Sequence, residues 1–161
     1  MNYRHSDRVG AFIIRQNGLN GYELLVFRQA DQATTAIEIP GGGVEPGETL
    51  EVALHREVLE ESGLHNLRVI RKLGTLQRCW LDTHNVACRH YFLLEAPPTT
   101  PDAWEHIVCG NGSDAGWRFL YFWTRPPSLT ATVGSWVAFL NAELLPELYG
   151  VEACHSPEAP R

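Results

Sequence analysis

Three glutamates, Glu57, Glu60 and Glu61, have the spacing that brings side chains together on a helix. They stand at positions i, i+3 and i+4 of a run that contains no helix breaker, so their carboxylates share one narrow arc. Like charges at this spacing destabilise a helix and resist joint ionisation unless a cation lies between them. Oxygen ligands without a His or Cys cluster favour Mg²⁺ or Mn²⁺ over Zn²⁺. The spacing therefore predicts a site for a hard divalent cation.

The charge balance around these glutamates indicates what such a site would handle. Between Glu45 and Glu61 there are six glutamates and one arginine, Arg56. Without a metal this stretch repels a phosphate group, whereas a bound divalent cation attracts one and commonly shares its coordination shell with phosphate oxygens. A solvated acidic helix face is the alternative explanation for a run of glutamates. The i, i+3, i+4 spacing favours the metal site.

The elements that must position these carboxylates are a glycine-rich loop and a helix. Residues 39–40 end an apolar segment, residues 41–43 are three glycines, and residues 45–47 form a turn signal. The pattern then predicts a helix over residues 48–61, because no breaker interrupts it before the Ser-Gly pair at 62–63. The sequence thus predicts a loop that leads directly into the acidic helix.

Residues 42–64 resemble the signature of the Nudix hydrolase family, Gx5Ex7REUxEExGU, in which U is an aliphatic residue. Seven fixed and two aliphatic positions would coincide by chance in about one chain in a million or fewer. The resemblance implies a metal-dependent enzyme that cleaves the pyrophosphate linkage of a nucleoside diphosphate joined to another moiety, and it leaves the substrate within this class open. The matching residues are Gly42, Glu48, Arg56, Glu57, Val58, Glu60, Glu61, Gly63 and Leu64.

The same resemblance implies a role for each polar residue of the signature. Glu57, Glu60 and Glu61 are expected to be metal ligands, with the backbone carbonyl of Gly42 completing the coordination of Mg²⁺ or Mn²⁺. Arg56 and Glu48 are expected to pair and to orient the carboxylates. Among the helix carboxylates Glu60 is the predicted general base, although members of the family differ in where the base lies. The candidates outside the helix, each of which also reads as a simple loop charge, are Glu95, Glu105 and Asp114.

Substrate selection must come from residues outside the signature, which handles only the diphosphate. We predict that Arg28 meets phosphate, that Trp80 stacks on a base, and that Arg89 contacts phosphate or ribose. A solvated strand-end charge and a core aromatic are the alternative explanations for Arg28 and Trp80. Further candidates for stacking, which could equally be core aromatics, are Tyr91, Trp104 and Trp117. Further candidates for polar contacts, which could equally be satisfied surface or hairpin histidines, are His84 and His90.

Composition narrows the class of protein. A chain of 161 residues with 44% apolar content suits one globular domain. Its formal net charge of −6 argues against a nucleic-acid polymer or a membrane surface as a partner. The resemblance implies a small-molecule nucleoside diphosphate derivative instead. The first residues lack an apolar signal region, and no apolar run approaches the roughly 20 residues that span a bilayer. We therefore expect a cytoplasmic protein, in which the thiols are reduced. The sequence leaves open whether the protein forms a homodimer.

The order of apolar runs predicts an α+β domain over residues 1–149, with a mixed β-sheet between helices that is similar to the Nudix α/β/α sandwich. Residues 96–115, rich in Pro and Gly, predict a long loop or lid. Residues 132–149 predict a helix that Pro146 kinks or ends, and residues 150–161 predict a disordered tail. The predicted strands are 8–15 paired with 22–27, a short strand at 36–39, 67–81 paired with 86–94, and 117–123.

A second class of function stays open beside the enzyme. A Nudix-like sensor or regulator would bind a nucleotide without hydrolysing it. Such modules tend to lose signature glutamates, and this chain retains all of them. The sequence therefore favours the hydrolase.

Overall fold

One mixed sheet organises the molecule, in a computed structural model that describes residues 2–32, 36–126, 129 and 134–150. Its strand order is β4-β5-β1-β2-β7-β6, with β3 paired to β1 beside β2. Strand β1 runs parallel to β5, and the other pairs are antiparallel. The strands are β1 Arg4–Gln16, β2 Tyr22–Gln29, β3 Gly41–Gly43, β4 Arg68–Trp80, β5 Asn85–Glu95, β6 Ala103–Ile107 and β7 Arg118–Thr124.

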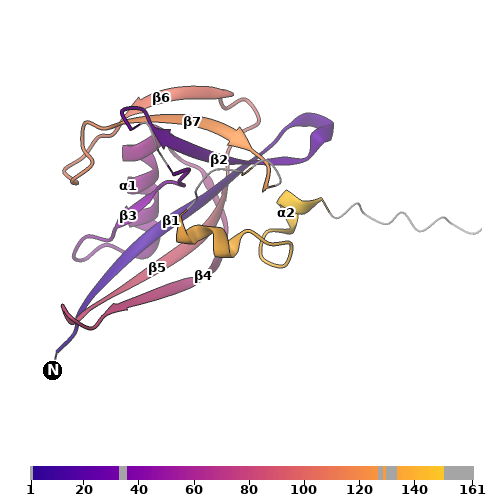
Figure 1. The fold of residues 1–161 in the computed structure, drawn as a ribbon. Helices are drawn as coiled ribbons and strands as arrows, with labels where there is room; N and C mark the ends of the chain where they lie inside the picture. The colour runs from indigo at the N-terminus through magenta and orange to yellow at the C-terminus, as the bar shows by residue number, and fades with distance from the viewer. Residues whose placement is uncertain (1, 33–35, 127–128, 130–133, 151–161) are drawn as a thin grey trace, which may run out of the picture.

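Helices cover both faces of this sheet (Figure 1). Helix α1 (Leu50–Ser62) packs on one face, and the 3-10 helix η3 (Ser135–Phe139) and the short helix α2 (Pro146–Tyr149) pack on the other. Strand β1 is buried on both faces, because Ala11 and Ile13 join the core under α1 while Phe12 and Ile14 join the core under η3. The prediction of an α+β fold with a mixed sheet between helices is confirmed.

Helix α1 has a defined cap at each end. The Thr49 side chain accepts a hydrogen bond of 3.2 Å from the N–H of Val52, and Gly63 adopts a left-handed conformation with φ of 79°. The predicted start at Glu48 is two residues too early, because Thr49 is the N-cap and Glu48 lies in the preceding turn. There the carboxylate of Glu48 accepts a hydrogen bond from the N–H of Glu45 at 3.0 Å.

The glycine loop is a strand rather than an irregular turn. Gly41–Gly43 forms β3, which pairs with Arg8–Gly10 of β1. A Cβ atom on Gly41 would lie 2.3 Å from the carbonyl oxygen of Val9, so only glycine permits this approach. The strand predicted at residues 36–39 is reduced to an isolated bridge between Phe27 and Glu38.

Two predictions for the second half of the chain are wrong. The predicted loop over 96–115 contains strand β6, which pairs with β7 at the edge of the sheet. The predicted helix over 132–149 is divided in its described part into η3 and a four-residue α2 that Pro146 begins. Proline fits the first helical position because its fixed φ and missing N–H cost nothing there. The predicted tail from residue 151 onward lies outside the described residues.

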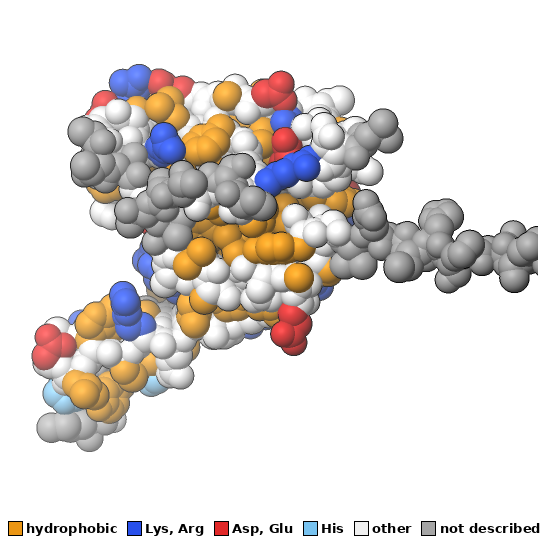
Figure 2. Space-filling view, turned by 45° about the vertical axis from the view of Figure 1, so that its right-hand side comes forward, with side chains coloured by type: hydrophobic (Ala, Val, Ile, Leu, Met, Phe, Trp, Pro, Cys, Tyr) orange, Lys and Arg blue, Asp and Glu red, His pale blue; other side chains and the backbone are white. Residues whose placement is uncertain are grey.

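The hairpin of β4 and β5, together with the start of β1, extends away from the body as an arm (Figure 1), and Figure 2 shows hydrophobic side chains gathered on it. Trp80, 41% exposed, and Leu81 lie near its tip. Cys79 pairs with Val86 and Cys88 with Gln77, so these cysteines do not face each other. Within the described ranges, no helix has the length and apolar character needed to cross a bilayer.

Candidate active site

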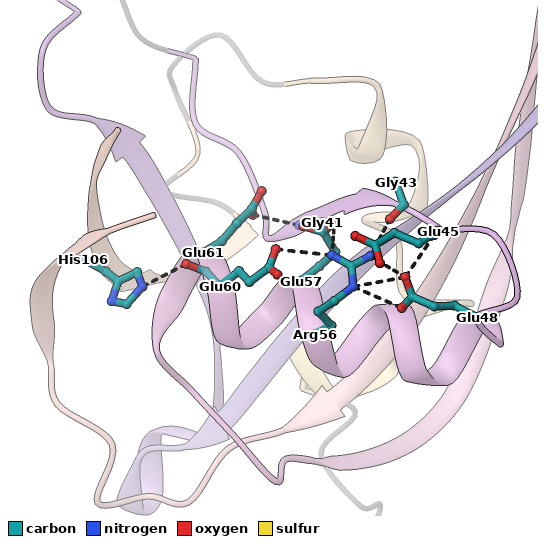
Figure 3. A network of polar contacts seen from close by, with 9 residues as sticks. All are labelled: Gly41, Gly43, Glu45, Glu48, Arg56, Glu57, Glu60, Glu61 and His106. Atoms are coloured by element: carbon teal, nitrogen blue, oxygen red, sulfur yellow. Dashed lines mark hydrogen bonds and ion pairs between the residues drawn. The ribbon is translucent and has the colours of Figure 1, made fainter. Parts of the chain in front are cut away.

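Arg56 is the centre of a polar network that joins the turn, strand β3 and helix α1 (Figure 3). Its Nε donates to both carboxylate oxygens of Glu48 at 3.1 Å, and its Nη2 donates to the carbonyl of Gly43 at 2.8 Å. Its Nη1 donates to Glu57 at 2.9 Å and to Glu60 at 3.2 Å. The predicted pairing of Arg56 with Glu48 is present, and the same guanidinium also holds two of the three helix glutamates.

The electrostatics of the network follow from these contacts. The hydrogen bond from Arg56 lowers the pKa of Glu48, and the same bond raises the pKa of Arg56. Burial raises the pKa of Glu57, while its hydrogen bond and charge interaction with Arg56 oppose the rise. Glu48 is therefore a firmly ionised partner for Arg56, and Arg56 favours the charged form of Glu57 against the effect of burial.

Glu61 has a different environment from the other two helix glutamates. It is 5% exposed, and its carboxylate turns away from Arg56 to accept a hydrogen bond of 3.0 Å from the N–H of Gly41. Burial raises its pKa well above the ordinary value. A buried carboxylate of this kind gains most from a cation, because the cation removes the cost of desolvating its charge.

Strand β3 lies closest to the Glu57 side chain of α1 at Gly42. A Cβ atom at this position would lie 2.3 Å from the carboxyl carbon of Glu57. The Glu57 carboxylate thus lies directly against the backbone of β3. Carboxylate oxygens from the helix and backbone groups of the strand meet at one place, which is the donor chemistry that Mg²⁺ and Mn²⁺ require.

The donor set fits a divalent cation in chemistry, although Arg56 now occupies two of the carboxylates. Among the described residues, no three His, Cys, Asp or Glu side chains converge in the way that would hold a metal ion. Glu57 and Glu60 face Arg56 while Glu61 faces Gly41. Rotation of the Glu57 and Glu60 side chains away from Arg56 would free their oxygens as ligands, and Arg56 would keep its bonds to Glu48 and Gly43.

The C-terminal end of α1 is held by side chains and backbone of the second half of the chain, of which the sequence had singled out Trp104 alone, as a candidate for base stacking. The last carbonyls of a helix have no partner within it, and here strands β6 and β7 and the turn after β6 supply donors at 2.9 Å. Since a carbonyl only accepts, the Nε2 atom of His106 carries the proton. The donors are His106 and the N–H of Cys109 to Glu60, Tyr121 to Glu61, and Trp104 to Ser62.

The three candidate bases outside the helix have different surroundings. The charge of Asp114 contributes to raising the pKa of both Glu57 and Glu61, so it lies near the carboxylates. Glu95 accepts hydrogen bonds from Tyr22 and Arg68, each at 3.2 Å, and Glu105 is paired with Arg118. Of these candidates, the fold brings Asp114 to the glutamates and engages the other two elsewhere.

A cavity of about 220 Å³ opens beside Glu61, and two of the residues proposed from the sequence to contact the substrate line it. Arg89 lines it and Tyr91 forms part of its wall, whereas Trp80 lines an adjoining groove on the arm, which Arg8 and Arg89 also border. The lining also includes Arg8, Glu38 and Trp136, to which no sequence pattern pointed. The full lining is Arg8, Val9, Gly10, Phe27, Glu38, Ile39, Pro40, Gly41, Gly42, Glu61, Arg89, Tyr91 and Trp136.

The remaining sequence candidates lie elsewhere. Arg28 is absent from this lining, and its guanidinium lies over the ring of Phe122 at 5.4 Å. Trp104 stacks on Tyr121 with ring centroids 4.9 Å apart, and Trp117 is an exposed residue before β7. His90 bonds to Asp7 and Lys72, and His84 lies in the turn between β4 and β5. Trp104 and His90 thus have structural partners.

Comparison with known proteins agrees with the site. The NUDIX domain model matches residues 4–128. A putative 8-oxo-dGTP diphosphatase of Bacillus subtilis is 39% identical over 69 residues, 43% of each chain, and an RNA pyrophosphohydrolase of Psychromonas ingrahamii is 32% identical over 101 residues, 53% of this chain and 54% of that protein. The chain thus spans about half the length of these curated relatives.

Solved structures share the fold at lower identity. The NUDIX domain of Shewanella oneidensis NrtR, determined in complex with ADP ribose, has a TM-score of 0.62 at 14% identity, with 93% of this chain and 91% of that chain covered. The E. coli ORF135 protein has a TM-score of 0.55 at 21% identity, with 97% and 96% covered. With the domain match over most of the chain and the signature residues assembled as described, this chain belongs to the Nudix hydrolase family.

Proposed function

We propose that this protein is a metal-dependent hydrolase that cleaves the pyrophosphate linkage of a small-molecule nucleoside diphosphate joined to another moiety. The observation that carries the proposal is the cluster of Glu57, Glu60 and Glu61 on one side of α1, next to a cavity that Arg8 and Arg89 border. Acidic ligands for a cation beside two arginines suit a polyphosphate, because the cation and the guanidinium groups bind different parts of one anion. The names of the two curated relatives, a diphosphatase and a pyrophosphohydrolase, support the same reaction.

Glu57, Glu60 and Glu61 would hold the cation, which we propose to be Mg²⁺ or Mn²⁺. When bound, such a cation neutralises charge on phosphate oxygens and lowers the pKa of water that it contacts. Arg8 and Arg89 would bind the anionic substrate and orient it against α1. Glu60, whose carboxylate lies at the exposed side of the cluster, is our proposed general base, and Asp114 is the alternative that its nearness to Glu57 and Glu61 supports.

A panel of substrates tests the proposal directly. The wild-type protein should release phosphate or pyrophosphate products from nucleoside triphosphates, dinucleoside polyphosphates or nucleotide sugars in the presence of Mg²⁺, as measured by chromatography of the products. EDTA should abolish the activity, and Mg²⁺ or Mn²⁺ should restore it. Full turnover in rigorously metal-free buffer would defeat the metal-dependent mechanism. Binding of a nucleotide without turnover of any substrate would favour the sensor instead.

A further inference from the structure

One face of the arm carries four arginines. Side chains alternate between the two faces of a strand, and the register of β4, β5 and β1 aligns nine residues on this face. None of the nine is acidic, and each of the four arginines is exposed. This face, which we call the basic arm surface, concentrates positive charge in a chain whose formal net charge is −6. Its residues are Arg4, Ser6 and Arg8 of β1, Leu76, Arg78 and Trp80 of β4, and Asn85, Ala87 and Arg89 of β5.

The guanidinium groups of this surface form no ion pair within the described part of the chain. Arg8 and Arg89 are direct neighbours in the register, and like charges on adjacent strands destabilise a sheet. Glu38 lies at the body end of the arm, where its charge interacts with Arg89 without forming an ion pair. The fold thus holds positive charge that its own carboxylates do not neutralise. The arginines that do form ion pairs are Arg15, Arg56, Arg68, Arg71 and Arg118.

The basic arm surface is hollowed between its charged side chains. Two adjoining hollows, of about 290 and 610 Å³, lie on it, and the residues that line both are Arg8, Trp80, Ala87 and Arg89. Ala87 has Ser6 as its neighbour on β1, so small side chains occupy the middle of the face. Trp80, at the end near the tip, is 41% exposed. The surface therefore combines contacts for an anion, an accessible aromatic ring and room for a ligand.

We propose that the basic arm surface binds a single-stranded nucleic acid, which is a partner of this protein and not the substrate of its hydrolytic site. Arginines bind the phosphates of such a strand, and an exposed aromatic ring stacks on its bases whatever their sequence. From Arg8 to Arg4 the face spans four residue steps of about 3.3 Å, or about 13 Å. This length matches about four stacked nucleotides at roughly 3.4 Å each. The whole-chain charge, which argued against a nucleic-acid partner, conceals this surface because the six glutamates of residues 45–61 outweigh the four arginines in the sum.

An anionic membrane surface is the alternative partner for a basic arm with an aromatic residue. It would suit the tip, where Leu81 is 74% exposed beside Trp80. It would leave Arg8 and Arg89 unused, because they lie at the body end of the arm and also line the cavity beside Glu61. A flexible strand can follow the whole face from Trp80 to Arg89, and this continuity favours the nucleic acid.

Arg8 and Arg89 belong to two sites. They line the cavity beside Glu61 as well as both hollows of the basic arm surface. A bound strand should therefore compete with the substrate, so that KM rises as the strand concentration increases while kcat stays unchanged. This consequence rests on the proposed function, whereas binding of the strand does not. An unchanged KM with the strand bound would overturn the placement of the strand over these two arginines.

Fluorescence anisotropy with a labelled oligothymidylate about 12 nucleotides long tests the binding directly. The oligonucleotide has a 5′-hydroxyl and the buffer contains EDTA, so neither hydrolysis nor a bound metal contributes. We expect the logarithm of the binding constant to fall with the logarithm of the salt concentration, with a slope of about −3 for four arginine–phosphate contacts. Arg78→Gln should weaken binding by about three-fold or more and change the slope to about −2.

Arg68→Gln is the matched control for Arg78→Gln. It removes the same charge from the same strand, but at the far end of β4, where Arg68 pairs with Glu95 at 3.2 Å. This variant should leave both the affinity and the slope unchanged. Arg4→Gln, on β1, should reproduce the effect of Arg78→Gln, so the test does not depend on the folding of one variant. The Tm of each variant shows whether it is folded.

Trp80→Ala separates stacking from charge. It should weaken binding of the oligonucleotide by about five-fold or more, with the salt slope unchanged, because a stacked ring carries no charge. Leu81→Ala is its control, since Leu81 is an exposed apolar neighbour at the tip and should leave this binding unchanged. Equal losses in the two variants would assign the effect to the apolar tip and would overturn stacking on Trp80.

The outcomes distinguish this inference from the proposed function. Equal effects of Arg78→Gln and Arg68→Gln would mean general charge attraction and would overturn the basic arm surface as a site. Binding to vesicles of phosphatidylserine and phosphatidylcholine, without binding of the oligonucleotide, would overturn it in favour of a membrane surface, and absence of both would overturn it outright. None of these results touches the hydrolase, because no substrate is present. Site-specific binding of the oligonucleotide by a protein that hydrolyses no nucleotide would support this inference and defeat the proposed function.

Discussion

Glu60 and Glu48 both contact Arg56, yet we expect their replacement by glutamine to have different consequences. Glu48→Gln removes the charge and one of the two acceptor oxygens that hold the Nε side of Arg56, and changes of this indirect kind typically cost about 10 to 100-fold in metal affinity or activity. Saturating Mg²⁺ should recover part of that loss. Glu60→Gln should stay impaired at saturating Mg²⁺, because it also removes the proposed base. Measuring kcat against Mg²⁺ concentration for both variants tests the difference.

Equal rescue of the two variants would reduce Glu60 to a ligand. Asp114→Asn would then be the next variant to measure, because Asp114 is the outside carboxylate whose charge reaches Glu57 and Glu61. Glu105→Gln is the suitable control for it, since Glu105 is engaged by Arg118 at the edge of the sheet. A loss of kcat confined to Asp114→Asn would identify the base.

Among the site residues, the sequence could predict the contacts between residues that lie close together along the chain. Glu48 and Arg56 share one turn-and-helix unit, so their pairing follows from the motif, and Gly42 precedes it directly. Glu38, Asp114 and Trp136 meet the same site from three separate segments. Their approach depends on the pairing of strands and on packing under η3, which no local pattern contains.

At the scale of elements, strands β6 and β7 hold the end of helix α1. His106→Ala removes one of two donors to the carbonyl of Glu60, and Cys109 N–H keeps the other. We expect the free energy of unfolding to fall by about 1 kcal/mol, measured as a lower Tm. We also expect kcat to need a higher Mg²⁺ concentration to reach its maximum, because Glu60 is less firmly placed. His106→Gln, which retains a donor, should recover part of both. A lower Tm with an unchanged Mg²⁺ dependence would limit His106 to a structural role.

The elements that sequence patterns missed are those in which tertiary contacts override local signals. Strand β6 is short and surrounded by Pro and Gly, and its inward residues, Trp104 and His106, are polar-tipped rather than aliphatic. The helical spacing of Val137, Leu140, Leu144 and Leu148 predicted one helix. The core under η3 instead receives the three leucines from a loop and a four-residue helix, and Val137 in η3 is 41% exposed. The apolar stripe thus indicated burial correctly for the three leucines, and it indicated the wrong element.

At the scale of the whole molecule, one ion pair ties the last helix to the far edge of the sheet. Arg71 of β4 donates to the two carboxylate oxygens of Glu147 at 2.6 and 3.0 Å and to the carbonyl of Leu144 at 2.8 Å. The hydrogen bond from Arg71 lowers the pKa of Glu147. A depressed pKa in the folded state means that the stabilisation is present above the unfolded pKa and is lost as pH falls through the folded pKa.

We therefore expect Glu147→Gln to destabilise the protein by about 1 kcal/mol at pH 7 and by less as the pH is lowered below the ordinary glutamate range. Urea unfolding of both proteins between pH 7 and pH 3 measures the difference. Glu143→Gln, on an exposed residue of the same segment, is the control and should show little change at any pH. A destabilisation that does not depend on pH would mean that packing of the side chain, rather than its charge, secures α2.

The parallel pairing of β1 with β5 has a consequence for how the active site comes into existence. Arg4 lies beside Asn85 and Ile14 beside Glu95, so the whole of helix α1 belongs to the chain segment that this pairing closes into a loop. Contacts between such distant residues form slowly, because the entropy of closing the loop is lost before the contacts compensate for it. The acidic helix can form locally, but Arg8 on β1 and Arg89 on β5 become neighbours only through this closure. During refolding, recovery of nucleotide binding should therefore never precede formation of the sheet, however early the helix appears.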